Sequence, residues 1–149
     1  MTRANIHFRS GQLDGANIYR HSNGSPECLG ADIQDFLDET TRLKDKRWDD
    51  GEYLAAKFLV WQAAIYVALN SKREKHRVHV MEFTTVAPCL EDHGDINYRY
   101  IVQCDKADER PHVFVEKAET NDKDQLVCTP IGEIVKGEDG VITLAGKPL

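Results

Sequence analysis

A run of 17 residues at positions 53–69 limits the fold of this chain more than any other feature, because 15 of the 17 are hydrophobic. Its two polar members are Lys57 and Gln62. The run is short for a membrane span, which needs about 20 predominantly apolar residues. A helix that is apolar on nearly all sides has to be covered by other parts of the protein. We therefore expect a central helix that begins near Asp49 or Asp50 as its cap and ends at about Ser71.

An amphipathic helix is predicted just before this central one, starting at about Gly30. Apolar residues recur there at helical spacing, namely Ile33, Phe36, Leu37 and Leu43. Acidic residues lie on the opposite face and suit the positive N-terminal end of a helix. Two short β-forming runs, 4–8 and 16–20, precede this helix on either side of a glycine-containing turn, and they predict an N-terminal hairpin.

The rest of the chain is predicted to form strands. Segments 77–85, 95–104 and 111–117 are rich in β-forming residues. In sequential order they are expected to pair antiparallel and to bury one face against the helices. A Gly-Glu-Asp-Gly turn between segments 131–136 and 141–145 predicts a hairpin. The expected fold is α+β, an antiparallel sheet packed against two helices in the order ββααβββ plus a C-terminal β-hairpin.

The polar segment 119–125 is the best position for a linker in this chain. We expect residues 1–118 to form an α+β core domain, and residues 119–149 to be a linker and β-hairpin packed on the same domain. The hairpin either caps the sheet or docks on a second subunit. A homodimer formed through this hairpin or through an exposed strand is therefore one expectation.

Composition argues against several classes of function. The chain has 149 residues, of which 41% are hydrophobic and 30% charged, as in soluble globular proteins. Its net charge of −6 disfavours nucleic-acid binding, which usually needs a basic surface. The first residues do not resemble a signal peptide, so we expect a cytoplasmic protein with no membrane partner and with free thiols. Neither the cysteine and histidine spacings nor the segment 91–95 (Glu-Asp-His-Gly-Asp) matches a standard metal motif, and we expect no metal and no cofactor.

The segment 17–30, Asn-Ile-Tyr-Arg-His-Ser-Asn-Gly-Ser-Pro-Glu-Cys-Leu-Gly, is the main candidate for a ligand site. A strand delivers Arg20 and His21 to a Gly/Ser loop just ahead of a helix, whose free N–H groups attract anions. Arg20 could grip a phosphate or carboxylate, and His21 could transfer a proton. The predicted anion site comprises Arg20, His21, Ser22, Gly24 and Ser25. The alternative is structural, since a corner between a strand and a helix needs such residues in any case.

Residues 18–26, Ile-Tyr-Arg-His-Ser-Asn-Gly-Ser-Pro, resemble the Y-R-H-x-[D/N]-G-x-P opening of a family of small bacterial and phage proteins without an assigned activity. Segment 94–100, Gly-Asp-Ile-Asn-Tyr-Arg-Tyr, also resembles a stretch of that family. The chain departs from the pattern at Asn23, where Asp is expected, and at Ser25, where an aromatic residue is common. The resemblance lends no catalytic residue, but it implies an origin in mobile genetic elements.

Tyr98, Arg99 and Tyr100 form a second candidate cluster. If the two tyrosines face inward, their hydroxyl groups need partners, and Arg20 could supply one if its strand is a neighbour. The alternative is an aromatic core stripe with Arg99 solvated on the other face.

Two classes of function follow from these observations. The first expectation is a non-enzymatic binding or interaction protein, an accessory factor of mobile-element origin, with no enzyme activity. The alternative is a small hydrolase or an enzyme for phosphate or another small anionic ligand. That enzyme would hold the anion with Arg20, use His21 for proton transfer, and orient His21 with Tyr98 or Tyr100. An enzyme needs a concave pocket at this corner, whereas a binding module needs an uncovered apolar patch.

Overall fold

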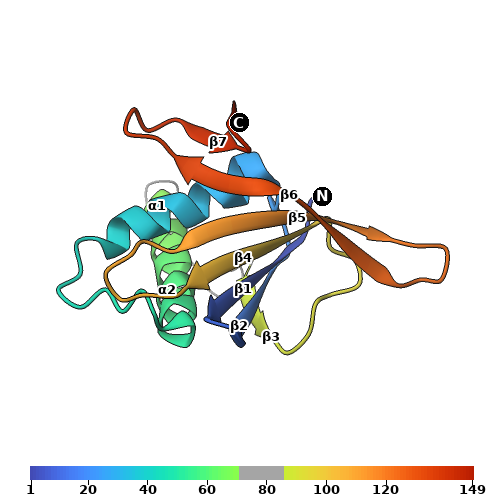
Figure 1. Ribbon diagram of the computed structural model, residues 1–149, viewed down its shortest axis with the longest axis horizontal. Coiled ribbons are helices and arrows are strands. Elements are labelled where there is room, and N and C mark those ends of the chain that lie inside the picture. The colour runs from blue at the N-terminus through green and yellow to red at the C-terminus, as the bar shows by residue number, and fades with distance from the viewer. Residues whose placement is uncertain (71–85) are drawn as a thin grey trace.

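We describe residues 1–70 and 86–149 in a computed structural model, with side chains up to Ile65 in the first range. Eight strands form one sheet in the order β3-β2-β1-β4-β5-β6-β7-β8 (Figure 1). The elements are β1 (Ala4–Ser10), β2 (Leu13–Arg20), a π-helical turn (Pro26–Gly30), α1 (Ala31–Thr40), α2 (Gly51–Asn70), β3 (Val86–Cys89), β4 (Tyr98–Cys104), β5 (His112–Thr120), β6 (Leu126–Lys136), β7 (Ile142–Leu144) and β8 (Lys147–Pro148). The α+β class and the two helices are confirmed.

The sheet is mixed, so the expectation of a wholly antiparallel sheet was wrong. β1 pairs with β4 in parallel, with Ala4 opposite Tyr98, whereas the other paired strands are antiparallel. The cause lies in the connection before β4, which starts that strand at the same end of the sheet as β1. There the Asn97 amide donates to the Arg3 carbonyl at 2.9 Å, and the Arg3 amide donates to Asn97 Oδ1 at 2.9 Å. Alternating hydrophobicity identifies strands, but it does not say which strand lies beside which.

The order along the chain also differs from the predicted ββααβββ plus hairpin. In the described residues, six strands follow α2, and the first of them is the short edge strand β3. The strand predicted at 77–85 lies outside the described residues. The N-terminal hairpin is present as β1 and β2, and the C-terminal one as β6 and β7.

The segment predicted as a linker is the turn of a hairpin within the sheet. Asn121 accepts the amides of Lys123 and Gln125 on its side chain at 2.9 and 3.0 Å, and Asp124 adopts a left-handed backbone with φ 56°. β5 and β6 pair on either side of this turn, from Thr120–Leu126 to Val113–Ile134, with a bulge after Val115. The strands after residue 125 therefore continue the same sheet.

The hydrophobic core lies between one face of the sheet and the two helices. Alternate residues of β1 (Ala4, Ile6 and Phe8) are fully buried, and they pack with buried side chains of α1 and α2, among them Phe36 and Phe58. Gly30 sits so close to β6 that an added Cβ would lie 2.4 Å from Ile134 Cδ1. A larger residue at this position would have to displace the Ile134 side chain, so glycine lets α1 start directly against the sheet.

Helix α2 is less enclosed than its composition predicted. Leu54 and Phe58 are fully buried, but Val60 is 67% exposed, and Ala56 and Ala64 are exposed as well. The reason is that α2 meets the sheet and α1 on one side of its axis, so its outward side has no neighbour among the described residues. No helix in the described ranges is long and apolar enough to span a membrane.

Candidate functional site

Arg20, at the end of β2, is a buried arginine that joins three elements. It is 4% exposed. Its Nε donates to the Ser22 carbonyl at 2.7 Å and its Nη1 donates to Gln62 Oε1 of α2 at 2.7 Å. Its Nη2 lies 3.3 Å from Asp32 Oδ2 of α1. Burial raises the pKa of Asp32, although the Arg20 charge and the Gln62 amide act in the opposite direction. The guanidinium is therefore directed toward protein groups between β2, α1 and α2.

The loop after Arg20 is held by backbone contacts. The Gly24 amide donates to the Thr2 carbonyl at 3.0 Å, and the Gly24 carbonyl accepts the Tyr100 hydroxyl at 2.7 Å. A Cβ on Gly24 would lie 2.9 Å from Ala4 Cβ, so the close approach requires glycine. Ser25 begins the π-helical turn, where its carbonyl accepts the Leu29 amide at 2.8 Å. These contacts give Gly24 and Ser25 structural roles at the corner.

His21 is the exposed residue of the predicted anion site. Its ring Nδ1 forms a hydrogen bond with the Tyr19 hydroxyl at 3.3 Å. Arg20 points to the helices while His21 faces solvent. The two side chains that were expected to act together are thus directed to different surroundings.

The second predicted cluster is divided between the two faces of the sheet. Tyr100 is fully buried on the face that carries the helices, and burial raises its pKa strongly. The partner of its hydroxyl is the Gly24 carbonyl rather than Arg20. Tyr98 is half-buried, with its ring centroid 6.5 Å from that of Tyr100. Arg99 lies on the other side of the sheet, which we call the open face and which carries Asn5, His7, Asn17, Arg99 and Glu116.

The open face holds a polar network, centred on Asp92, that the sequence did not predict. Asp92 Oδ1 lies 2.5 Å from His7 Nε2, and Asp92 Oδ2 accepts from Arg99 Nη1 at 3.0 Å. Arg99 Nε in turn donates to Glu116 Oε2 at 2.5 Å. Burial alone would raise the pKa of Asp92, but the bonds from His7 and Arg99 outweigh it and lower that pKa to about 2. Asp92 is therefore a firmly ionised carboxylate that ties a loop to the sheet.

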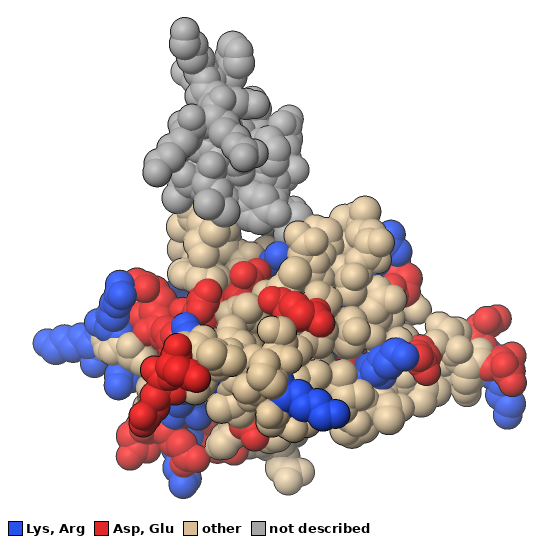
Figure 2. All heavy atoms as spheres, turned by 90° about the horizontal axis from the view of Figure 1, so that it is seen from above, with Lys and Arg blue, Asp and Glu red and all other residues tan. Residues whose placement is uncertain are grey.

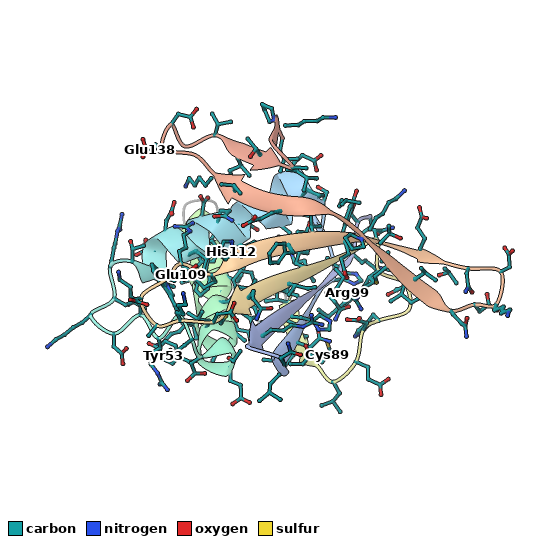
Figure 3. The ribbon with its side chains drawn as sticks, in the orientation of Figure 1. Tyr53, Cys89, Arg99, Glu109, His112 and Glu138 are labelled. Atoms are coloured by element: carbon teal, nitrogen blue, oxygen red, sulfur yellow. The ribbon has the colours of Figure 1, made fainter. Side chains whose placement is uncertain are left out.

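A second set of contacts holds the same loop on the open face, near the position of Cys89 in Figure 3. Buried Asn5 donates from Nδ2 to Asn17 Oδ1 at 2.8 Å and to Cys89 Sγ at 3.1 Å. Its Oδ1 accepts the His93 amide at 3.2 Å. The His93 ring stacks on Tyr19 with centroids 3.8 Å apart and an angle of 8°. The loop that carries Asp92 and His93 therefore covers the open face on the β3 side.

The carboxylates and the imidazole of segment 91–95, which matches no standard metal motif, point in different directions. Asp92 binds His7 and Arg99, His93 stacks on Tyr19, and Asp95 pairs with Arg3. Among residues 1–70 and 86–149, no group of three potential ligands is placed to hold a metal ion. The polar residues Asn5 and His7, alternating with buried apolar ones in β1, were the signal in the sequence that could have indicated the network.

Three of the thiols, those of Cys89, Cys104 and Cys128, are shifted away from the reactive form. Burial raises the pKa of Cys89 and of Cys128, and it raises that of Cys104 to about 12. A nucleophilic thiol needs the opposite shift, because the thiolate is the reactive form.

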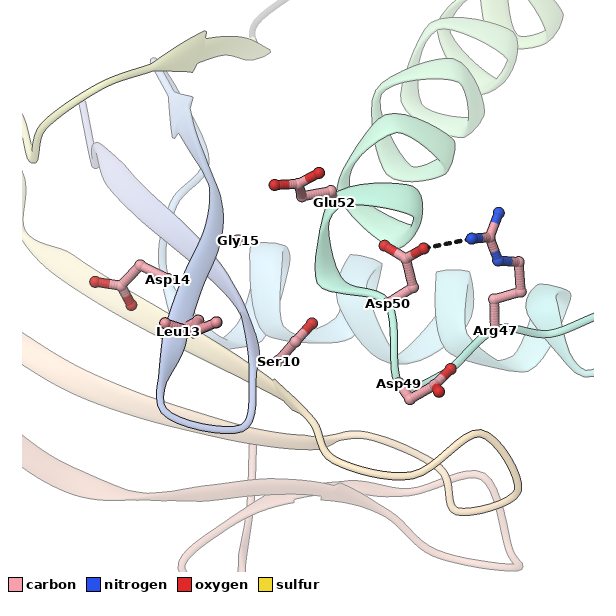
Figure 4. Close-up of a pocket in the computed structure, with 8 residues that line it drawn as sticks. All are labelled: Ser10, Leu13, Asp14, Gly15, Arg47, Asp49, Asp50 and Glu52. Atoms are coloured by element: carbon pink, nitrogen blue, oxygen red, sulfur yellow. Dashed lines mark hydrogen bonds and ion pairs between the residues drawn. The ribbon is translucent and has the colours of Figure 1, made fainter.

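The structure has a shallow polar hollow and an apolar groove that could receive a ligand. The hollow, of about 520 Å³, lies where the β1–β2 turn meets the start of α2, and its carboxylates come from Asp14, Asp49, Asp50 and Glu52 (Figure 4). Asp50 Oδ2 accepts a hydrogen bond from Arg47 Nη2 at 2.6 Å. Its Oδ1 accepts the Tyr53 amide at 2.9 Å and so caps α2.

The groove, of about 210 Å³, lies between α1 and α2. We call it the α1/α2 groove, and its lining residues are Phe36, Glu39, Thr40, Leu43, Lys57, Val60, Trp61 and Ala64. Trp61 is partly exposed there, and its ring packs on Phe36 with centroids 5.8 Å apart. The sequence did not predict this groove, because the helix that forms one of its walls was expected to be covered on all sides.

No protein-family model, curated protein or solved structure matches this chain. Its function therefore has to be inferred from its own residues.

Proposed function

We propose that this chain is a non-enzymatic binding protein and that the α1/α2 groove is its binding surface. The observation that carries the proposal is the exposure of apolar side chains there, with Val60 67% and Leu43 38% exposed beside a partly exposed Trp61. Aromatic side chains at the centre of an uncovered apolar patch are typical of protein interfaces. The origin in mobile elements stays a proposal that rests on the resemblance of residues 18–26.

The alternative is an enzyme that binds an anion at the Arg20–His21 corner. Arg20 would have to leave Asp32 and Gln62 to hold a substrate, which would leave a half-buried carboxylate and a buried amide without their partner. His21 would act alone, since its contact is with the Tyr19 hydroxyl rather than with a carboxylate. The arrangement of this corner thus favours the binding protein over the enzyme.

Two-dimensional amide NMR with two probes tests the proposal. We expect the hydrophobic dye ANS to shift the Trp61 indole signal and the amides around the groove, and the Val60→Lys variant to weaken this response. Inorganic phosphate is expected to cause no saturable shift in residues 20–26. A saturable phosphate shift in this segment that the His21→Ala variant abolishes would support the enzyme instead.

A further inference from the structure

We propose that the occupant of the α1/α2 groove is a second copy of this chain, related to the first by a two-fold axis that runs along the groove. This inference rests on the proposed function, because it names the partner that the groove binds.

The outward side of α2 is the first argument. Between Tyr53 and Ile65, the exposed residues are Ala56, Lys57, Val60 and Ala64, and only Lys57 carries a charge. A helix whose outer side faces water normally carries polar residues there. This side of α2 and the groove beside it form one continuous apolar surface, because Val60 and Ala64 belong to both.

The charges that border the groove are the second argument. Glu39 comes from α1 and Lys57 from α2, so an acidic and a basic residue lie on opposite walls. In a two-fold contact the same patch meets itself. An axis along the groove places α2 of each copy over α1 of the other, and therefore brings Lys57 of each copy toward Glu39 of its partner. The patch is complementary to itself in charge.

The net charge of the chain makes this patch the favoured place for self-association. Two molecules that each carry −6 repel on average, so contact is favoured where the local charges are balanced. Glu39 is balanced by Arg42 and Lys57 around the groove. Acidic and basic side chains are intermingled on the surface in view in Figure 2.

Glu39 and Lys57 are free to turn toward a partner. Glu39 lies 3.3 Å from Arg42, but both side chains are more than half exposed, and such surface pairs contribute little. Lys57 Nζ lies 5.2 Å from the centroid of the Tyr53 ring. A change of either charge is therefore expected to leave the fold intact.

The sheet edges expected from the sequence as dimer contacts are less suitable. Among the described strands, the terminal one at one edge is β8 with two residues, and at the other β3 with four residues including Pro88. Short strands and proline are the features by which proteins prevent edge-to-edge pairing.

Charge reversal tests the arrangement. The masses of the wild type, Glu39→Lys, Lys57→Glu and the double variant are measured by sedimentation over roughly 1 µM to 1 mM, a range that spans weak and moderate affinities. We expect a dimer for the wild type and for the double variant. Each single variant is expected to dimerise at least about tenfold more weakly, because like charges would face each other.

A mixture of the two single variants gives the most specific readout. The Lys57→Glu variant has two acidic residues at these positions, and the Glu39→Lys variant has two basic ones. The mixture is therefore expected to form a heterodimer at concentrations at which each variant alone is monomeric. The matched control is Val135→Lys, which adds a charge at a residue of β6 that is 45% exposed and outside the groove. Its mass should equal that of the wild type.

Several outcomes would overturn the inference. A wild type that is monomeric throughout the range removes the dimer but leaves the proposed function to the ANS experiment, which tests the groove and not its occupant. A dimer that survives both single reversals, or that Val135→Lys dissociates, places the contact elsewhere. A mixture that stays monomeric excludes the two-fold axis along the groove.

Discussion

Two arginines, Arg20 and Arg99, show how differently the two faces of this sheet use the same side chain. On the helix side Arg20 is 4% exposed and has one carboxylate partner, Asp32, at 3.3 Å. On the open face the Arg99 side chain is 25% exposed and binds two carboxylates, Asp92 at 3.0 Å and Glu116 at 2.5 Å. The pKa of Asp32 is raised by burial, whereas that of Asp92 is lowered to about 2 by its bonds. Asp32 has long contacts with Arg20 and Gln62, at 3.3 and 3.5 Å, whereas Asp92 has shorter ones with His7 and Arg99, at 2.5 and 3.0 Å. Short bonds to a carboxylate, and not burial alone, decide which protonation state the fold favours.

Removal of either arginine should give the largest change in the free energy of unfolding, and the change should be larger for Arg20 than for Arg99. We expect Arg20→Ala to lower the free energy of unfolding by about 3–5 kcal/mol, because it empties a buried position and leaves buried Gln62 and half-buried Asp32 without their partner. Arg99→Ala should cost about 1.5–3 kcal/mol, since the Arg99 side chain is itself 25% exposed and Asp92 keeps its bond from His7. Urea denaturation at pH 7 measures both values. Arg42→Ala, whose side chain is 79% exposed, is the control and should change the free energy by less than about 0.5 kcal/mol. Equal losses of stability in Arg20→Ala and Arg99→Ala would contradict the proposed difference between the two faces of the sheet.

The carboxylates should respond to pH in opposite directions. The pKa of Asp92 in the folded state, about 2, lies below the unfolded value of 3.8, so its stabilisation is complete above pH 3.8 and is lost as the pH falls toward 2. We expect Asp92→Asn to cost about 2 kcal/mol at neutral pH, and this cost to shrink in acid.

Asp32, with its raised pKa, should behave in the reverse manner. Its ionised form is disfavoured in the folded state, so the wild type should gain stability relative to Asp32→Asn as the pH falls through the raised pKa. Urea midpoints of the wild type and both variants between pH 7 and pH 3 check the two signs. Parallel curves for the two variants would contradict this assignment.

The smallest effect concerns His112, at the end of the open face away from Asp92. Its Nδ1 lies 2.6 Å from Glu133 Oε1, and this bond raises the pKa of His112. The resulting stabilisation is complete below pH 6.5 and is lost as the pH rises through the raised pKa. The side chain is 50% exposed, so we expect His112→Gln to cost less than about 1 kcal/mol at pH 6 and less still at pH 8. NMR titration of the ring protons and thermal melts at both pH values measure this; a melting difference that grows with pH would contradict the sign.

Local patterns in the sequence were sufficient for several elements of the fold. Ile33, Phe36 and Leu37 recur at helical spacing and lie on the buried side of α1, and the polar turn between β6 and β7 was recognisable from its glycines. The parallel pairing of β1 with β4 was not predictable in this way, because it depends on how residues 90–97 cross the sheet. Asp92 and His7 are 85 positions apart, so no local pattern could indicate their contact.

The candidate sites show the same division. Arg20 was identified as a residue with a role, but its partners Gln62 and Asp32 come from helices whose orientation the sequence does not specify. The groove was missed for a physical reason, since an all-apolar helix segment indicates burial without saying on how many sides.

The parallel pair of β1 and β4 also has a consequence for how the chain reaches its native state. Arg3 and Asn97 bond across 94 positions, and the whole β1–β4 ladder has the same separation. Contacts between such distant positions form late and slowly, because a long loop has to close first. They raise the relative contact order of this domain, which favours slow folding. During synthesis β1 can pair with β2 early, but its other edge stays unsatisfied until about two thirds of the polypeptide has left the ribosome.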